Sequence, residues 1–506
     1  MTATIDNPVL IVGAGPAGLV TAIELARHGV RPLVVERHPS TSIFPRATGV
    51  STRSMEIFRG YGIDDAVRRG GWRVVPRQAT VARLDDATPI EGPLGFPDEA
   101  ACLAVSPVAA AVSPQDHLEP VLVDHLRSLG GEVRFSTDLI AFEQDADRVC
   151  ATIRDRESGM VSNVCSTFLV GADGPRSEVR EGLGITMEGP DDLGRYLSLL
   201  FRADLSDVLG DTRYGLYLVG EPGPGRPPIV VVPSGADDRY VVGIPLPAGM
   251  DDAAVAGAFP LDRSIALIRE MTGRPELDVE LLATSVFAFA AQVATRWREG
   301  RAFIVGDAAH RMTPRGGRGM NTAIADGHDL GWKLAWVVRG LAGRALLDTY
   351  EVERGPIGRR NVAMSMTEGG GGSDDGLFED LGPLDAQPGQ RAPHVWLTRA
   401  AQRVSTLDLF GERFVLLVSG EGSVWATAVG TIGDVVPLRA HAIDDPSFAA
   451  VYRLAPGGAV LVRPDGIVAW RSEAEAADPA GVLRDALATA MGRPADGRAR
   501  STMVAA

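Results

Sequence analysis

Cysteine is scarce in this chain of 506 residues, which contains only Cys102, Cys150 and Cys165. None of the three belongs to a C-x-x-C pair, so a disulfide scaffold, a zinc ribbon or a dithiol redox centre has little support. No group of histidine and carboxylate residues has the spacing of metal ligands either. We therefore expect a protein of the reducing cytoplasm that binds no metal.

Positive charge is outnumbered by negative charge in this sequence, and long apolar runs are absent from it. The formal net charge is −15, the sequence pI is about 5.1, and Lys333 is the only lysine. Nucleic-acid-binding proteins usually carry a basic patch, so we expect no nucleic-acid partner. No run of 18 apolar residues occurs, and the first eight residues lack the basic segment and apolar core of a signal peptide. We therefore expect no membrane partner.

The chain is too long for one hydrophobic core, which rarely exceeds roughly 250–300 residues, and its length predicts about three domains. Short buried strands and helices predict an α/β frame, interrupted by short strands between Gly, Pro and Asp turns that predict an inserted antiparallel sheet. We expect the frame at 1–183 and 291–368, with a short segment near 75–110 assigned to the inserted domain, the inserted sheet at 184–290, a linker at 369–389 and a separate α/β piece at 390–506.

A dinucleotide-binding fingerprint opens the chain. Gly13-Ala14-Gly15-Pro16-Ala17-Gly18 follows the apolar run Val9–Val12 and precedes residues with helical spacing. In such a βαβ unit the glycines permit a tight turn, close approach of the backbone to a pyrophosphate, and helix–strand packing. Glu36 ends the second apolar run, where a carboxylate can accept hydrogen bonds from an adenosine ribose. The motif alone does not separate FAD from NAD(P).

Two later motifs narrow the choice. Val170-Gly171-Ala172-Asp173-Gly174-Pro175 resembles the Asp-Gly motif of flavoprotein aromatic hydroxylases, and Gly306-Asp307-Ala308-Ala309-His310 resembles their Gly-Asp motif. Residues 7–365 thus resemble the para-hydroxybenzoate hydroxylase family, the single-component class A flavin monooxygenases. The C-terminal piece resembles the thioredoxin-like tail of phenol and aromatic-polyketide hydroxylases. Like that tail, it has no redox cysteines.

The resemblance implies an α/β fold and a cofactor. The expected fold is a Rossmann-like FAD-binding domain of the GR2 type, an inserted, mainly antiparallel β-sheet domain for the substrate, and a C-terminal thioredoxin-like α/β domain. FAD is the implied cofactor, and NADPH or NADH is the implied transient reductant. The residues that we expect to bind FAD are Gly13, Gly15, Ala17, Gly18, Glu36, Arg37, Arg46, Gln115, Asp173, Asp307, Gly319, Met320 and Asn321.

Several of these assignments have plain alternatives. Asp173 could only hold its loop together, and Arg37 and Arg46 could be ordinary surface charges. Gly319, Met320 and Asn321 are expected to act through backbone N–H groups at a helix N-terminus, where the helix dipole favours the negative charge of reduced flavin. His310 is a tempting base, but a single histidine after a Gly-Asp motif is more often structural.

The implied reaction consumes O2 and NAD(P)H and hydroxylates an aromatic ring through a flavin C4a-hydroperoxide. The backbone at Pro314 is expected to shape that oxygen site. The substrate would lie between the flavin and the inserted sheet, and its nature is expected to be phenolic, of the aromatic-polyketide type used in antibiotic biosynthesis. The candidate lining residues, for which ordinary sheet packing is the alternative, are Tyr214, Tyr217, Tyr240 and Phe287.

Other functions remain open from the sequence. The same scaffold can run Baeyer–Villiger insertion or epoxidation, and its flavin motifs would look alike. An NAD-dependent dehydrogenase and a non-catalytic flavin-binding protein are weaker alternatives. A flavin halogenase is less favoured, because this sequence lacks the Trp-x-Trp-x-Ile-Pro motif of that group. The C-terminal piece could build a homodimer interface or merely cover the core.

Overall fold

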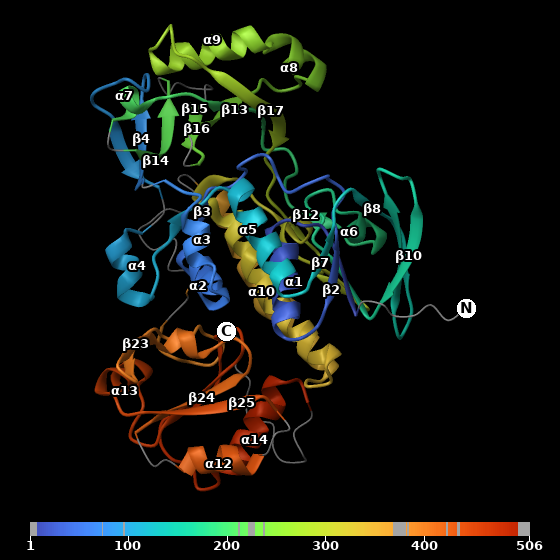
Figure 1. Cartoon of the computed structure of the whole chain (residues 1–506), viewed down its shortest axis with the longest axis vertical. Helices are drawn as coiled ribbons and strands as arrows, with labels where there is room; N and C mark the ends of the chain where they lie inside the picture. Colours follow the sequence, from blue (N-terminus) through green and yellow to red (C-terminus); the bar gives the residue numbers. More distant parts are fainter. Residues whose placement is uncertain are drawn as a thin grey trace. The chain divides into compact units, whose positions relative to one another are not determined.

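The computed structural model describes residues 8–72, 74–94, 97–210, 213–220, 228–235, 238–367, 381, 384–420, 424–432 and 436–493. Most of the expected linker at 369–389 lies outside the described residues. The chain forms two compact units (Figure 1). Within the described residues, unit 1 contains the chain up to Ala26, Arg31–His328 and the segment from Glu353; unit 2 contains Arg27–Val30, Asp329–Val352 and the chain from Leu381 onward.

Unit 1 is built on a six-stranded sheet whose central strands are short apolar runs. Strands buried on both faces of a parallel sheet are expected to be continuously apolar, and β1 is completely buried. Helix α1 (Pro16–Arg27) connects β1 to its parallel neighbour β2, as the fingerprint predicted. The order is β19 (Arg298–Glu299), β20 (Ala302–Ile304), β11 (Phe168–Gly171), β1 (Val9–Val12), β2 (Pro32–Val35) and β7 (Glu132–Arg134), and only β19 runs antiparallel to its neighbour.

An antiparallel meander in unit 1 carries a disulfide that no sequence motif predicts. Its strands are β8 (Thr137–Gln144), β9 (Val149–Asp155) and β10 (Val161–Ser166). Cys150 on β9 lies directly opposite Cys165 on β10, and the two are bonded. The interpretation that disulfide bonding has little support is therefore wrong for this pair, because the register of two strands brings together residues whose spacing matches no motif.

A second, seven-stranded sheet in unit 1 is mainly antiparallel. All neighbours in it are antiparallel except β14 and β4, which are parallel. The structure places two strands from residues 75–93 at its edge. The order is β17 (Glu280–Ala288), β13 (Arg195–Arg202), β16 (Arg239–Pro245), β15 (Ile229–Pro233), β14 (Tyr214–Val219), β4 (Val75–Val81) and β5 (Ile90–Pro93).

The two faces of this sheet differ. Helices α8 (Asp252–Ala258) and α9 (Leu261–Thr272) run along one side of it (Figure 1). Their buried residues join Tyr217, Tyr240 and Val242 in one hydrophobic core. Because side chains alternate along a strand, the residues between these point to the opposite face, where most are only half-buried.

Two small sheets and several helices complete unit 1, and α10 and α11 each also have a part in unit 2. Two small sheets pair β3 (Gly49–Val50) with β6 (Ala111–Val112), and β12 (Met187–Glu188) with β18 (Gln292–Ala294) and β21 (His310–Arg311). The helices are α2 (Thr52–Tyr61), α3 (Asp64–Arg68), α4 (Glu99–Val105), α5 (Gln115–Ser128), α6 (Glu178–Gly182), α7 (Ser206–Leu209), the long α10 (Arg318–Val338) and α11 (Thr349–Ser365). No helix among the described residues has the length and apolar character needed to cross a bilayer.

Unit 2 is an α/β unit with its own sheet and core. Its four strands are β25 (Leu438–Ile443), β24 (Phe414–Ser419), β26 (Ala459–Val462) and β27 (Val468–Ser472), and β26 and β27 form a hairpin across the turn Pro464-Asp465-Gly466. Helices α12 (Val424–Ile432), α13 (Pro446–Tyr452) and α14 (Pro479–Ala490) and the hairpin β22 (Trp396–Arg399) and β23 (Gln402–Ser405) complete it. Its core includes Trp332 and Trp336 from the second half of α10. The thioredoxin-like likeness of this unit stays a prediction.

Candidate functional site

The glycines of the fingerprint have three different physical roles. Gly13 has a φ of +108°, and a Cβ there would lie 2.2 Å from the Ala172 carbonyl oxygen. A Cβ on Gly18 would lie 2.1 Å from the Gly13 carbonyl oxygen, so helix α1 packs against the turn only with glycine at this position. A Cβ on Gly15, in contrast, would meet nothing within 4 Å. The turn therefore leaves room beside Gly15, at the N-terminus of α1, where a pyrophosphate would be favoured.

Glu36 is held at the end of β2 by hydrogen bonds from the backbone. The Ala14 N–H donates to Oε2 at 2.9 Å, and the His38 N–H donates to Oε1 at 2.9 Å. His38 Nδ1 also lies 2.5 Å from Oε1. The carboxylate is thus fixed beside the glycine turn, and its Oε2 keeps one lone pair for a further donor such as a ribose hydroxyl. Arg37 is half-buried, and its carbonyl oxygen accepts a hydrogen bond from Arg156 at 3.1 Å.

Asp173 performs the loop-holding role that was its plain alternative. Its carboxylate accepts hydrogen bonds from the Ser177 hydroxyl at 2.5 Å and from the Val179 N–H at 3.1 Å, which fastens the start of α6. Burial raises the pKa of this carboxyl, and these hydrogen bonds oppose the rise. A role of Asp173 toward a nucleotide stays a prediction.

Arg180 links the Asp-Gly motif to the Gly-Asp motif. This buried guanidinium donates to the Pro175 carbonyl oxygen at 3.2 Å and to the Ala308 carbonyl oxygen at 3.3 Å. Sequence reasoning assigned Arg180 no role, although it follows the Asp-Gly motif closely. Its contacts make it the residue that fixes the spacing of the two motifs.

Asp307 points out of a buried turn. Gly306 and Ala308 on either side of it are buried, whereas the Asp307 side chain is exposed. The protein around it raises the pKa of the Asp307 carboxyl by desolvation, while the positive charges of His310, Arg46 and Arg311 lower it. A recessed, accessible carboxylate at the end of a central strand is suited to accept hydrogen bonds from the hydroxyl groups of a ribityl chain.

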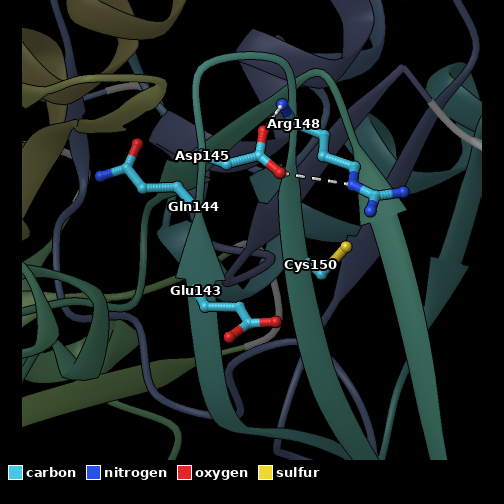
Figure 2. A pocket seen from close by; sticks show the side chains of 5 residues that line it. All are labelled: Glu143, Gln144, Asp145, Arg148 and Cys150. Carbon is cyan, nitrogen blue, oxygen red and sulfur yellow. Dashed lines mark hydrogen bonds and ion pairs between the residues drawn. The ribbon is translucent and has the colours of Figure 1, made fainter.

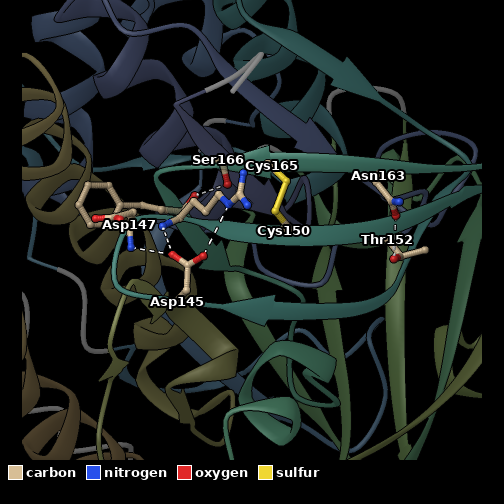
Figure 3. The surroundings of a disulfide bond; sticks show 9 residues. Asp145, Asp147, Cys150, Thr152, Asn163, Cys165 and Ser166 are labelled. Atoms are coloured by element: carbon tan, nitrogen blue, oxygen red, sulfur yellow. Dashed lines mark hydrogen bonds and ion pairs between the residues drawn. A yellow bond between two sulfur atoms is a disulfide. The ribbon is translucent and has the colours of Figure 1, made fainter. Parts of the chain in front are cut away.

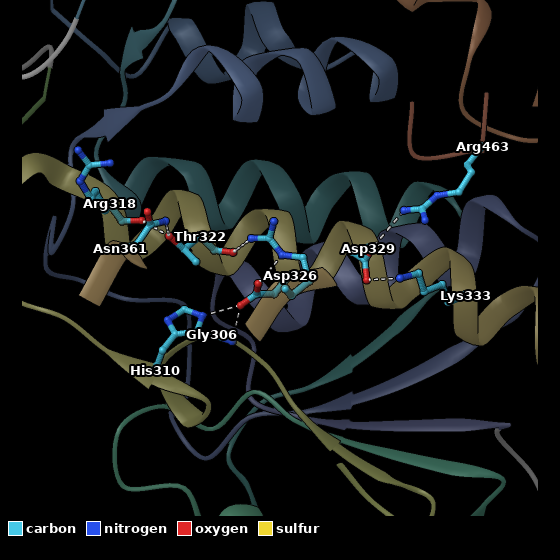
Figure 4. A network of polar contacts seen from close by, with 10 residues as sticks. Gly306, His310, Arg318, Thr322, Asp326, Asp329, Lys333, Asn361 and Arg463 are labelled. Atoms are coloured by element: carbon cyan, nitrogen blue, oxygen red, sulfur yellow. Dashed lines mark hydrogen bonds and ion pairs between the residues drawn. The ribbon is translucent and has the colours of Figure 1, made fainter. Parts of the chain in front are cut away.

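A buried network holds this turn from behind, centred on Asp326 of α10 (Figure 4). Asp326 accepts hydrogen bonds from the Gly306 N–H at 3.3 Å, from His310 Nε2 at 2.6 Å and from Arg354 Nε at 2.9 Å. Burial alone would raise the pKa of Asp326, but the charges of His310 and Arg354 hold it below its ordinary value. His310 is completely buried, which supports its structural role.

The N-terminus of α10 is anchored by the side chain of Asn321. Its Oδ1 accepts from the Ser51 N–H and the Ser54 hydroxyl, both at 2.8 Å, and its Nδ2 donates to the Gly49 and Gly317 carbonyl oxygens. All four hydrogen-bonding positions of the Asn321 amide are therefore used within the protein. The binding of flavin by the backbone N–H of Asn321 stays a prediction. The first N–H groups of a helix have no partner within the helix.

The loop that carries Arg46 is fastened by a buried carboxylate that sequence reasoning missed. Glu119 on α5 accepts the Ser42 N–H at 2.7 Å and the Gln115 side-chain amide at 2.7 Å. The Gln115 N–H donates to the Ala47 carbonyl oxygen at 2.8 Å. The four-residue spacing of Gln115 and Glu119 on one helix face was the available signal. Arg46 is exposed, and its charge acts on both Glu119 and Asp307.

The other predicted residues lie in two places. Ala17 and Met320 are buried, Gly319 is half-buried, and Pro314 is exposed with its carbonyl oxygen accepting the Gly317 N–H at 3.1 Å. Tyr217 and Tyr240 belong to the hydrophobic core beneath α8 and α9, and Tyr214 packs against its border. Phe287 is 38% exposed and stacks on Tyr196.

These features fit FAD. A glycine turn with free space, a carboxylate fixed after β2, an accessible aspartate after β20 and a helix N-terminus belong to one unit of the chain. Together they define a dinucleotide-binding flavoprotein. Comparison with known families identifies the class of flavoprotein. Residues 6–365 match the FAD binding domain family, and residues 385–494 match the aromatic-ring hydroxylase C-terminal family. The chain belongs to this family of FAD-dependent aromatic hydroxylases.

Curated relatives match over nearly their whole length. The chain is 37% identical to the tetracenomycin B2 monooxygenase-dioxygenase of Streptomyces olivaceus, over 97% of this chain and 99% of the relative. It is also 37% identical to aklavinone 12-hydroxylase RdmE of Streptomyces purpurascens, over 95% and 98%.

A solved structure has the same fold. The ternary complex of aklavinone-11 hydroxylase with FAD and aklavinone superposes with a TM-score of 0.87 at 33% identity, covering 97% of this chain and all of that one. The protein is thus an FAD-dependent aromatic monooxygenase of mixed α/β fold, as the sequence predicted. None of these comparisons supports Baeyer–Villiger chemistry or epoxidation.

Proposed function

We propose that this monooxygenase hydroxylates a polycyclic phenol of the aromatic-polyketide class, and that the rings lie on the face of the seven-stranded sheet opposite α8 and α9. The relatives support the class, since their names refer to aklavinone and tetracenomycin. The observation that carries the proposal is a row of small residues across four strands. Val230, Gly243, Ser198 and Ser285 are successive cross-strand partners on that face.

The shape of this row suits a flat ligand. A Cβ at Gly243 would meet nothing closer than Val230 Cβ at 3.8 Å, so there is room for a further group at this point of the row, whereas the neighbouring Ser198 is buried. At one end stand Tyr196, Phe287 and Phe289, with ring centroids 4.4 to 5.8 Å apart. Aromatic rings at such distances stack in offset or tilted arrangements. A planar ring system would extend this stack over the small residues.

The chain's own residues would bind and orient FAD. Glu36 would accept hydrogen bonds from the adenosine ribose, the N–H groups at the start of α1 would face the pyrophosphate, and Asp307 would face the ribityl chain. When bound, FAD supplies the redox chemistry: it takes a hydride from NADPH or NADH and activates O2. The helix dipole at Gly319 and Met320 would stabilise negative charge on the flavin ring. The aromatic face would exclude water from the reacting ring.

The test compares substrates of two sizes on the Gly243→Val variant. Valine suits a β-strand and meets only ordinary contacts here, so we expect normal folding and FAD content. It raises the floor beneath a polycyclic ring, so we expect KM for a polycyclic phenol to rise about tenfold, a change equivalent to about 1.4 kcal/mol. A monocyclic phenol should be affected less. NAD(P)H oxidation and product mass are measured, with one added oxygen and an intact ring as the expected product.

A matched control places valine on the other face. Thr284 is exposed and pairs with Leu199, one residue out of step with the row of Ser198 and Ser285, so Thr284→Val leaves the proposed floor unchanged. An equal rise of KM for both phenols, or for both variants, would exclude this face as the substrate floor. A ring-expanded product would exclude hydroxylation.

A further inference from the structure

The disulfide of the meander is set by strand pairing rather than by a flexible loop. Cys150 and Cys165 are register partners on β9 and β10, with Cα atoms 4.1 Å apart (Figure 3). Two residues further along, the Thr152 hydroxyl donates to Asn163 Oδ1 at 3.0 Å across the same strands. Because six successive residue pairs fix this register, the two sulfurs face each other whether they are bonded or reduced.

Only one of the two cysteines lines a hollow of the surface. A hollow of about 230 Å³ opens beside the β8–β9 turn and is lined by Glu143, Gln144, Asp145, Arg148 and Cys150 (Figure 2). Cys150 is half-buried, whereas Cys165 is 5% exposed. Thiol–disulfide exchange requires direct approach to a sulfur. An incoming thiol would therefore attack Cys150, and Cys165 would be the leaving group.

The charges of the hollow select among small reagents. Asp145 and Arg148 form an ion pair at 3.6 Å and offset each other. The five lining residues are then left with one net negative charge, from Glu143. Every attacking thiolate carries one negative charge, so a thiol with a further anionic group is repelled from such a site more strongly than an uncharged or cationic thiol.

The crosslinked strands are also tied to the strand before Asp307. Arg301, the residue before β20, donates from Nε to the Ala146 carbonyl oxygen in the β8–β9 turn at 2.8 Å and from Nη1 to the Thr167 carbonyl oxygen after β10 at 3.2 Å. The Arg301 N–H donates to Gln144 Oε1 at 2.7 Å. Arg301 therefore touches both strand ends that the disulfide joins, and β20 leads from it to the Gly306-Asp307 turn.

We propose that Cys150 and Cys165 form a reversible thiol–disulfide site, separate from the flavin site, that is oxidised by hydrogen peroxide and reduced by a small uncharged or cationic thiol. In oxidation, the Cys150 thiolate displaces hydroxide from peroxide and becomes a sulfenic acid. The Cys165 thiol then displaces water from that sulfur. The sum is two thiols and one peroxide giving one disulfide and two waters.

Reduction reverses the crosslink in two exchanges. The thiolate of the first small thiol attacks the Cys150 sulfur, forms a mixed disulfide and releases Cys165. A second small thiol attacks the sulfur of the first, releases Cys150 and leaves as the small-molecule disulfide. In the cell, the peroxide would come from turnovers of this enzyme in which no oxygen is transferred to the substrate. This source rests on the proposed function. The test adds peroxide directly, so its result does not depend on catalysis.

The first experiment measures exchange on the full-length holoenzyme. The protein is treated with hydrogen peroxide and then reduced with 2-mercaptoethanol or with 2-mercaptoethanesulfonate at equal thiolate concentration and low salt. Free thiols are trapped with N-ethylmaleimide and located by peptide mass. We expect residues 150 and 165 to become labelled together, with the neutral reagent about threefold faster, as one extra charge at roughly 7 Å in water predicts. Equal rates, or a crosslink that neither reagent opens, would overturn the proposal.

Two variants keep the test specific. Glu143→Gln removes the net charge and is expected to bring the two rates together, as is high salt. Cys102→Ser removes the buried third cysteine and should leave peroxide-dependent crosslinking unchanged. Loss of crosslinking in Cys102→Ser, or a rate difference that persists in Glu143→Gln, contradicts the assignment of the site.

The second experiment follows Arg301. Amide hydrogen exchange of residues 299–304 is compared in the oxidised protein, the reduced protein and the Cys165→Ser variant. We expect faster exchange in the last two, because the strand ends that hold Arg301 are no longer crosslinked. Identical exchange in all three would refute the coupling to β20 while the labelling result decides the redox site.

Discussion

At the scale of single residues, the cofactor site depends on side chains that do not face the cofactor. Asp326, Glu119, Arg180 and the amide of Asn321 each hold a backbone segment whose N–H groups or neighbouring side chains are exposed. Such supporting partners fix the geometry of a site as strictly as the residues that contact its ligand. Two of them lead to predictions.

The substitution Asp326→Asn is expected to destabilise unit 1 by about 3–5 kcal/mol, because it leaves His310 and Arg354 buried without their carboxylate. FAD should also be retained more weakly, because the amide offers only one acceptor oxygen to the Gly306 N–H, His310 and Arg354 in place of two. Thermal unfolding and FAD titration check this. Asp147→Asn is the control, because that side chain is 97% exposed. A variant as stable as the control would show that Asp326 does not hold the turn.

The substitution Glu119→Gln is expected to change how stability depends on pH. Burial raises the pKa of Glu119 above its ordinary value of 4.5, despite hydrogen bonds from Gln115 and Ser42. Between the ordinary pKa of about 4.5 and the raised pKa of the folded state, the folded protein holds a proton that the unfolded chain has lost. This group therefore makes the free energy of unfolding fall as pH rises from about 4.5. Denaturant unfolding at several pH values should show the variant gaining on the native protein toward neutral pH. A constant difference between the two proteins across that range would argue against it.

At the scale of elements, one hairpin of unit 2 has a turn whose two residues adopt backbone angles that they disfavour. β22 and β23 are joined by Ala400 and Ala401, whose φ angles are +47° and +63°. Two-residue turns with positive φ at both positions strongly favour Asn-Gly, whereas alanine in this region costs roughly 1–2 kcal/mol.

Replacing Ala400-Ala401 by Asn-Gly is therefore expected to stabilise unit 2 by about 1–2 kcal/mol. Ala450→Gly, which introduces glycine at an exposed position within α13, should instead destabilise by about 0.5–1 kcal/mol. Differential scanning calorimetry measures both. If neither replacement stabilises unit 2, or if both do, the positive φ angles of Ala400 and Ala401 do not cost the turn stability.

At the scale of the whole molecule, helix α10 serves both units. Its first half carries Asn321 and Asp326 in unit 1, and its second half supplies Trp332 and Trp336 to the core of unit 2. There Trp336 meets Phe414 edge to face at 5.2 Å, and the buried Lys333 pairs with Asp329 at 2.8 Å, which also faces Arg463 at 3.5 Å. Unit 2 is therefore not only the segment after the linker.

Removal of residues 384–506 is accordingly expected to expose Trp332, Trp336 and Leu346 and to make the remaining chain aggregate. An exposed patch of this kind binds apolar dyes and promotes association. Dye binding and sedimentation of the truncated protein test the expectation. A monomeric truncated protein that binds FAD without binding dye would show that the second half of α10 does not need unit 2.

The sequence by itself determined the frame and its cofactor class. Val9–Val12, the glycine turn and Glu36 form a local βαβ unit whose geometry follows from spacing along one short segment, and the two later motifs narrowed the cofactor to FAD. Likewise, the apolar runs Tyr214–Val219 and Ala459–Val462 form strands β14 and β26, because turn residues bound each run.

Only the tertiary structure decided what depends on partners far apart in the chain. Which face of the seven-stranded sheet Tyr217 and Tyr240 occupy depends on where α8 and α9 pack, and alternation alone cannot tell inside from outside. The Cys150–Cys165 bond depends on the register of two strands, and the grip of Asp326 on Gly306 joins residues that the chain separates by twenty positions. The sequence specifies the local conformations, but the packing of distant elements decides which side chains meet.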